Sequence, residues 1–284
     1  MRSLSAARAE AVEAEFMLRS LTGSPAADRE LLGLAARRIG GGVVLSASRD
    51  PIGFLSRALA FTEPVTGELV DQVLAFFRTE DTRAATLQIA PGSLPADWAE
   101  ICRARGIESH GRGLIKLGAP IERVAASARS GPRVTPVSEA DAARWAAVLV
   151  EAFEFPREGY PGLMAAPVGL AGFHPYALWD GDTIVGGANL FVDGDVASFN
   201  TGAVLPAYRN RGGQTALLAA RAAKARELGC RWVVAETGVP VEGTSNPSLN
   251  NMLRAGLETW YVRPQFRWAE TRGSKPSVRN AFDA

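Results

Sequence analysis

The sequence contains a strand pattern that runs through a basic, glycine-rich turn into a helix pattern, and this combination restricts the fold more than any other feature. Residues 198–205 alternate in character and stop at Pro206, which cannot continue the interior of a sheet. Beyond the turn, Leu218 and Ala222 share one helical face, and the pattern ends at Gly229, a residue type common at helix ends. A strand that leads directly into a helix is typical of an α/β protein.

The turn itself holds Arg209, Arg211, Gly212 and Gly213. Glycines let a backbone approach a ligand closely, and the first amide groups of a helix lack internal partners and carry the positive end of its dipole. A phosphate or diphosphate fits such a place, and the arginines add positive charge. We interpret the turn as a diphosphate-binding site. The alternative is a basic surface loop in front of an ordinary helix.

Residues 209–214 (Arg-Asn-Arg-Gly-Gly-Gln) resemble the coenzyme A-binding motif of the GNAT superfamily of N-acyltransferases, Arg/Gln-x-x-Gly-x-Gly/Ala after a central strand. Arg209 and Gly212 match the motif, whereas Gln214 stands where glycine or alanine is usual. The resemblance extends over about residues 133–268. It implies a mixed sheet with the order βα(α)βββαβαβ and acetyl-CoA as co-substrate. The cofactor-binding residues that it implies are Val204, Leu205, Arg209, Asn210, Arg211, Gly212, Gly213, Gln214, Thr215, Asn246 and Asn251; helix capping is the alternative for Asn246.

The elements expected around this motif agree with an α/β (α+β) fold. A helix starts after Ser138, and a short second helix is expected within residues 153–172. The pairs Asp180-Gly181 and Asp193-Gly194 mark two tight hairpins that join three strands. A buried strand over residues 231–236, a helix over residues 248–255 and one or two strands over residues 257–268 complete the sheet.

The first part of the chain repeats this pattern. Expected helices and strands alternate from residue 3 to residue 117, and a Gly/Pro/Ser-rich connector follows over residues 118–132. Gly256 ends a helix 150 residues after Gly106 does, so we interpret the chain as a tandem duplication; chance similarity of helix ends is the alternative. The expected domains are residues 1–120 and 133–270, with a polar tail from residue 271.

The first copy lacks the basic turn. Residues 62–67 read Thr-Glu-Pro-Val-Thr-Gly, so Glu63 would repel a diphosphate and Pro64 removes an amide donor. We therefore expect a degenerate first domain without a cofactor and a catalytic second domain. The first domain then shapes the acceptor site or stabilises the second.

The composition argues against several classes of ligand and partner. A net charge of +1 gives no global field for nucleic acid or an anionic membrane. Cys102 and Cys230 are far apart, which argues against a thiol metal cluster or a disulfide framework, and both are expected to fill the core. No metal is expected. The absence of a signal-peptide pattern and of a long apolar run predicts a cytoplasmic protein.

The sequence indicates the catalytic side chains less clearly than the cofactor site. Glu236 ends an apolar strand, so it is the candidate base or anchor for an ammonium group, with a solvated carboxylate as the alternative. Tyr261 is a second candidate, although strand tyrosines usually pack. Met252 occupies the place where many members of the family have a tyrosine acid, and a strand glutamate of some relatives falls near Ser198 or Asn200 here.

The resemblance thus implies an N-acetyltransferase that moves an acetyl group from acetyl-CoA to a primary amine. The acceptor is expected to be a small molecule or a peptide, and the protein a monomer or homodimer. Two alternatives stay open. One is a non-catalytic acyl-CoA-binding protein, favoured by the missing tyrosine. The other is an acyltransferase for a longer acyl or an aminoacyl donor.

Overall fold

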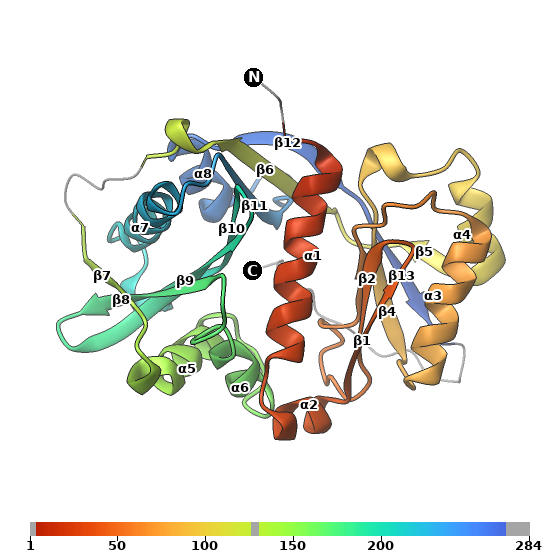
Figure 1. Ribbon diagram of the computed structural model, residues 1–284, viewed down its shortest axis with the longest axis horizontal. Helices are drawn as coiled ribbons and strands as arrows, with labels where there is room; N and C mark the ends of the chain where they lie inside the picture. Colours follow the sequence, from red (N-terminus) through yellow and green to blue (C-terminus); the bar gives the residue numbers. More distant parts are fainter. Residues whose placement is uncertain (1–3, 126–130, 271–284) are drawn as a thin grey trace.

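The computed structural model describes residues 4–125 and 131–270, and its two β-sheets lie on either side of one long helix (Figure 1). The expected tail from residue 271 and part of the expected connector lie outside the described residues. Within the described part, the first sheet has six strands and the second has seven, and each mixes parallel and antiparallel pairs. The α/β fold expected from the sequence is confirmed.

The first half of the chain alternates helices and strands. Its elements are α1 (Ala6–Thr22), α2 (Ala26–Leu32), β1 (Leu34–Ile39), β2 (Gly42–Ala47), β3 (Arg57–Leu59), α3 (Gly67–Thr79), β4 (Ala84–Gln88), α4 (Trp98–Arg105), β5 (Ile107–Ser109) and β6 (Leu114–Pro120). β1, α2 and β5 had no clear sequence signal, because each is short or only half-buried. β6 runs to Pro120, two residues into the stretch expected as a connector.

The second half follows the order expected from the sequence. Its elements are β7 (Arg133–Pro136), α5 (Ala142–Ala152), α6 (Tyr160–Ala165), β8 (Phe173–Asp180), β9 (Thr183–Asp193), β10 (Val196–Val204), α7 (Gly213–Glu227), β11 (Trp232–Gly238), α8 (Pro247–Arg254), β12 (Glu258–Arg263) and β13 (Gln265–Ala269). Gly181 and Gly194 adopt positive φ angles of 56° and 57° in the two expected hairpin turns. Single 3₁₀ turns are η1 (Pro91–Ser93), η2 (Ile121–Arg123), η3 (Glu139–Asp141) and η4 (Pro206–Tyr208).

The two halves exchange one strand each. The strand order is β1-β2-β3-β4-β13-β5 in the first sheet and β12-β6-β11-β10-β9-β8-β7 in the second. β6, from the first half, therefore lies between β11 and β12, and β13, from the second half, lies between β4 and β5. The two sheets match strand for strand, apart from the additional β7, which supports an internal duplication.

Side chains on the exchanged strands enter the core of the other half. Leu117 on β6 is fully buried among residues of β10, α7 and β11. Trp268 on β13 is buried against α3, where its ring stacks on Phe77 with the ring centres 5.9 Å apart. The sheets thus cross the boundary that the sequence suggests near residues 118–132.

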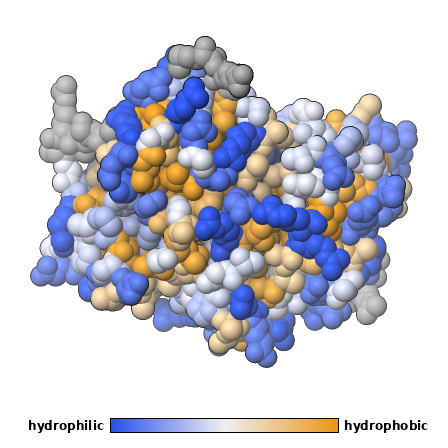
Figure 2. All heavy atoms as spheres, viewed as in Figure 1, coloured by the Kyte–Doolittle hydropathy of each residue, from blue (hydrophilic) through white to orange (hydrophobic). Residues whose placement is uncertain are grey.

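α1 packs against both sheets. Ala14 belongs to the hydrophobic cluster that contains Val43 and Leu45 of β2, whereas Ala9 and Val12 pack with Val196 and Val234 of the second sheet. α3 and α4 cover the other face of the first sheet, and α7 and α8 cover the other face of the second (Figure 1). On the face shown in Figure 2, hydrophobic residues appear between hydrophilic ones. The described residues contain no helix with the length and apolar character that crossing a bilayer requires.

Candidate active site

β10 and β11 separate halfway along their length. They pair in parallel from Val196 with Trp232 to Phe199 with Ala235, and the pairing then stops. Between Asn200 and Ala203 the register of β10 against β9 shifts, and Thr201 takes a positive φ of 51°. A bulge of this kind bends one strand away from its neighbour. The two strand ends therefore diverge before Val204 and Leu205.

Val204 and Leu205, two of the expected cofactor-binding residues, lie beside this gap, and only the amide of Val204 faces it. The amide of Leu205 donates to the carbonyl of Val185 on β9 at 2.9 Å, so it is already engaged. Amides alternate in direction along a strand, so that of Val204 points to the opposite side, toward β11. The amide of Leu205 is therefore not free for a cofactor, and cofactor binding by Val204 and Leu205 stays a prediction.

The basic turn leads into α7 without a side-chain cap. Asn210 and Gly212 have positive φ angles of 62° and 79°, and no side chain caps the helix N-terminus. Arg209 donates from Nε to the carbonyl of Val204 at 3.1 Å, and Arg211 lies over the ring of Tyr208. Both arginines and Gly212 are exposed. The first-turn amides, which have no acceptor within the helix, thus lie among exposed cations, and this arrangement suits a diphosphate.

The corresponding turn of the first half is built differently. The Thr66 hydroxyl caps α3 by accepting the amide of Leu69 at 3.2 Å. Glu63 is exposed in this turn and brings negative charge. Ala60 has a positive φ of 61° directly after β3, as Thr201 has near the end of the β10–β11 pairing. A residue with positive φ thus lies near this point in both halves, but of the two corresponding helices only α3 has a side-chain cap.

Three of the side-chain amides expected near the cofactor, those of Gln214, Asn246 and Asn251, bond α7, α8 and β11 to one another. Gln214 donates to the hydroxyl of Ser248 at 3.0 Å and accepts from Asn251, so it joins the start of α7 to α8. Asn246 caps α8 through the amide of Leu249 and donates to the end of β11 at Thr237 and Gly238. The capping alternative for Asn246 is therefore observed. Thr215 is exposed on the first turn of α7.

Arg221 of α7 binds backbone carbonyls on both strands beside the bulge of β10. This α7 residue is only 3% exposed, and its Nη1 donates to the carbonyls of Asn189 and Asn200 at 3.2 and 3.4 Å. Its guanidinium lies over the ring of Phe199, and burial lowers its pKa to about 9. Sequence reasoning missed Arg221, because a single arginine on a helix gives no sign of burial.

Glu236 and Tyr261, the two catalytic candidates, lie in one row on the face of the sheet that α1 covers. Register pairs place Glu236 beside Lys116 on β6, and Lys116 beside Tyr261 on β12. Lys116 contacts Oε2 of Glu236 at 3.3 Å, and Arg263 donates to the same oxygen. The Tyr261 hydroxyl donates to Glu10 of α1 at 2.7 Å. The structure therefore joins both candidates in one network of buried ion pairs.

α1 completes this network. Glu10 and Glu13 both pair with Arg263, and Glu13 also pairs with Lys116. Burial alone would raise the pKa of Glu13, but Arg263 and Lys116 lower it well below its usual value. Burial raises the pKa of Glu236 to about 7, and the charge of Glu13 acts in the same direction, against the lowering effect of Arg263 and Lys116. Burial and Glu10 together raise the pKa of Tyr261.

Polar atoms on the same face continue the row toward β9. Asn200 donates to the hydroxyl of Ser198 at 2.9 Å, and Asn189 is the register partner of Asn200. The side-chain oxygen of Asn189 is buried and has no hydrogen-bond partner in the described part of the chain. Carboxylate, amide and hydroxyl oxygens near the divergent strands are acceptors that suit the N–H groups of an amine.

The remaining residues that the sequence analysis named lie outside this network. Met252 is buried in the core of the second half, and Cys102 and Cys230 are free and buried. In residues 4–125 and 131–270, no three His, Cys, Asp or Glu side chains gather in a way that could hold a metal ion.

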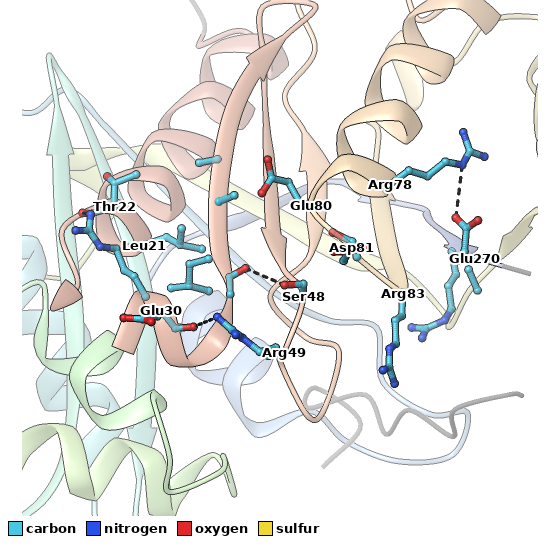
Figure 3. A pocket seen from close by; sticks show the side chains of 18 of the residues that line it. Leu21, Thr22, Glu30, Ser48, Arg49, Arg78, Glu80, Asp81, Arg83 and Glu270 are labelled. Atoms are coloured by element: carbon cyan, nitrogen blue, oxygen red, sulfur yellow. Dashed lines mark hydrogen bonds and ion pairs between the residues drawn. The ribbon is translucent and has the colours of Figure 1, made fainter. Parts of the chain in front are cut away.

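A hollow of about 1940 Å³ lies at the base of the first sheet, far along the chain from the basic turn. Figure 3 shows Arg78, Arg83 and Glu270 on one side of it and Thr22 and Glu30 on the other.

The second part of the chain matches a known family. Residues 103–238 match the family model described as an acetyltransferase (GNAT) domain. The matched range begins within α4 and ends with β11, so it includes the exchanged strand β6 and the turn before α7. No curated protein sequence matches the chain at a significant level.

Solved structures share the fold over nearly the whole chain. A GCN5-related N-acetyltransferase from Kribbella flavida has a TM-score of 0.62 and 17% identity, covering 95% of this chain and 98% of that one. A tandem GNAT protein from the clavulanic acid biosynthesis pathway has a TM-score of 0.57 and 15% identity, covering 93% of this chain and 96% of that one. A GCN5-related N-acetyltransferase from Sphaerobacter thermophilus has a TM-score of 0.55 and 14% identity, covering all of this chain and 96% of that one.

The two sheets, their helices and the turn before α7 define a protein with two GNAT-like units in tandem. Residues 103–238 are thus similar to a GNAT acetyltransferase domain, and the chain shares the fold of GNAT proteins over nearly its whole length.

Proposed function

We propose that the protein is an N-acyltransferase that transfers an acetyl group from acetyl-CoA to a primary amine of a small-molecule or peptide acceptor. We further propose that residues 133–270 form the catalytic domain and that residues 1–120 form a degenerate copy without a cofactor. The observation that carries this proposal is the uncapped N-terminus of α7, set among exposed arginines beside the divergent ends of β10 and β11.

The residues at this place suit the parts of coenzyme A. The first-turn amides of α7 with Arg209 and Arg211 supply hydrogen bonds and charge for the diphosphate. The amide of Val204 faces the gap between the strands and can polarise a carbonyl. Asn210, Gly212 and Gly213 shape the turn, and Gln214 with Asn251 fixes the start of α7 against α8.

The thioester supplies an activated acyl group, and the chain must supply an amine in its neutral form. The amine nitrogen forms a bond to the thioester carbon while the carbon–sulfur bond breaks, and the amine gives up a proton. Glu236 is the candidate for receiving that proton, because it is partly exposed at the divergent strand ends and its pKa is raised to about 7 by burial. Tyr261 acts within the network and not as a separate acid, because its hydroxyl already donates to Glu10.

Calorimetry with coenzyme A tests the cofactor site. We expect one molecule bound per chain and an affinity loss of ~100-fold or more in Arg209→Glu, because the change reverses a charge beside the diphosphate. Glu63→Arg changes the corresponding turn of the first half and serves as the matched control with unchanged affinity. Equal affinity of Arg209→Glu and the native protein, or a second bound molecule per chain, would contradict the proposal.

A panel of primary amines tests the transfer. We expect thiol release from acetyl-CoA with at least one amine and a product heavier by one acetyl group. A non-catalytic acyl-CoA-binding protein is the second candidate function. It is favoured by the buried Met252, which takes the place of a tyrosine acid and donates no proton. Coenzyme A binding without thiol release from any amine would support that candidate.

A further inference from the structure

The buried ion-pair network joins the two halves at the strand end proposed to carry the reaction. Glu10 and Glu13 come from α1, and Lys116 comes from the exchanged strand β6, so three members belong to the first half. Glu236 and Arg263 come from β11 and β12 of the second half. Side chains of Arg263, Lys116, Glu10 and Glu13 are at most 4% exposed.

Glu236 differs from the other carboxylates of this network. Its side chain is 16% exposed, and both of its ion pairs use Oε2. Within the described residues, Oε1 of Glu236 has no hydrogen-bond partner. Glu13, by contrast, uses one oxygen for Lys116 and the other for Arg263. Glu236 therefore offers the network's open oxygen, at the point where β10 leaves β11.

The two cations near Glu236 are shared with α1. Lys116 contacts Glu10, Glu13 and Glu236, and Arg263 contacts the same three carboxylates. A carboxylate that competes with others for the same cations gains less from each of them. The charged groups that act on Glu236 are Glu10 and Glu13 of α1, Arg57 of β3, Lys116 of β6 and Arg263 of β12. Tyr261 of β12 bonds to Glu10, and Gln88 of β4 bonds to Arg263.

We propose that the active site is composite: Glu13 of the first half is a positioning residue that occupies Lys116 and Arg263, so that Glu236 is the carboxylate of the network that exchanges a proton with the acceptor amine. This inference rests on the acyltransferase function proposed above and deepens it. The degenerate half thus does more than stabilise the second half, because it sets the protonation of a group in the other half's site.

Substitution of Glu13 separates this role from a purely structural one. In Glu13→Gln, Lys116 and Arg263 are released to Glu236 and a neighbouring negative charge is removed. Both changes favour the charged form of Glu236, so its titration midpoint falls. Glu15→Gln is the matched control on the same helix, because Glu15 pairs with the exposed Arg38 outside the network.

The titration can be followed by NMR of the full chain labelled with carbon-13 at the glutamate carboxyl groups, in the absence of coenzyme A. We expect one carboxyl resonance that titrates near neutral pH, is missing in Glu236→Gln, moves to lower pH by roughly one unit or more in Glu13→Gln, and stays in place in Glu15→Gln. Glu10→Gln, which removes a carboxylate from the same two cations, is expected to shift it in the same direction and serves if Glu13→Gln does not fold.

The outcomes are distinct. An unchanged midpoint in both α1 variants, or no neutral titration that depends on Glu236, overturns the inference even if the protein acetylates amines. A shifted midpoint in a protein without transferase activity supports the network but overturns the proposed function. With an acceptor in hand, the acid limb of the pH profile of kcat/KM is expected to move with the NMR midpoint.

Discussion

At the scale of single residues, the two parts of the candidate site use charge in opposite ways. Around Arg209 and Gly212, cations are exposed beside a helix N-terminus without a side-chain cap, and a diphosphate would supply the missing negative charge. Around Glu236, charges of both signs are buried and already paired. Substitutions in the turn are therefore expected to act on binding, whereas substitutions in the network act on stability and on proton exchange.

Gly212 allows a paired test of the turn. No atom lies within 4 Å of a Cβ placed on Gly212, but its φ is +79°. Gly212→Ala is expected to cost about 1 kcal/mol of stability through backbone strain and to keep most of the coenzyme A affinity. Gly212→Asp adds a negative charge at the helix N-terminus and is expected to lower the affinity by a further ~100-fold. Calorimetry on both variants checks this prediction, and equal affinities of the two would contradict it.

The raised pKa of Glu236 predicts that the stability of the protein depends on pH. Its pKa is raised from 4.5 to about 7 in the folded protein, so between these values the folded state holds a proton that the unfolded state has lost. The contribution of Glu236 to the free energy of unfolding is therefore largest below pH 4.5. It is lost as the pH rises through 7. Relative to Glu236→Gln, the native protein should lose about 1–3 kcal/mol of unfolding free energy over this window. Urea denaturation at a series of pH values measures the difference, and parallel curves would contradict the assignment.

At the scale of elements, α7 and α8 form one unit around the end of β11. Gln214 connects the two helices, and Asn246 connects α8 to Thr237 and Gly238. Asn246 thus has a defined structural task, and its expected contact with the cofactor remains a prediction.

The capping role of Asn246 can be tested by graded substitution. Asn246→Ala removes the cap and both donors, so we expect a loss of about 1–2 kcal/mol in unfolding free energy. Asn246→Asp keeps an oxygen for the amide of Leu249 and should lose less. Asn250→Ala, at an exposed position of α8, is the control. Chemical denaturation gives the stabilities, and a calorimetric loss of coenzyme A affinity without loss of stability in Asn246→Ala would assign the residue to the cofactor instead.

At the scale of the whole molecule, strand exchange makes the halves depend on each other. Each sheet lacks an interior strand without the other half, and Trp268 and Leu117 leave cavities where they are absent. Removing one large buried side chain already costs about 3–5 kcal/mol, and a missing strand also leaves backbone groups unpaired.

We therefore expect residues 1–130 and residues 131–284 to be unfolded or aggregated when produced separately, and to form one folded complex when produced together. Circular dichroism and amide NMR spectra of the separate and the co-produced fragments measure this. A dispersed spectrum from either fragment alone would show that exchange is not required for folding.

The sequence alone determined the local structure of the second half and the location of the turn. Polarity periodicity and turn chemistry depend on neighbours in the chain, so the hairpins at Gly181 and Gly194, α7 and the end of β10 could be predicted. The pattern of residues 209–214 was also enough to indicate the family, which the domain match supports.

Only the tertiary structure decided which sheet each late strand joins and what surrounds Glu236. β6 and β13 are short apolar strands, and nothing in their own residues distinguishes one sheet from the other. Glu10, Glu13, Lys116, Glu236 and Arg263 look like separate charges in the sequence, because a charged residue is usually solvated. Their burial depends on α1 lying between two sheets, and such long-range packing leaves no local periodicity in the chain.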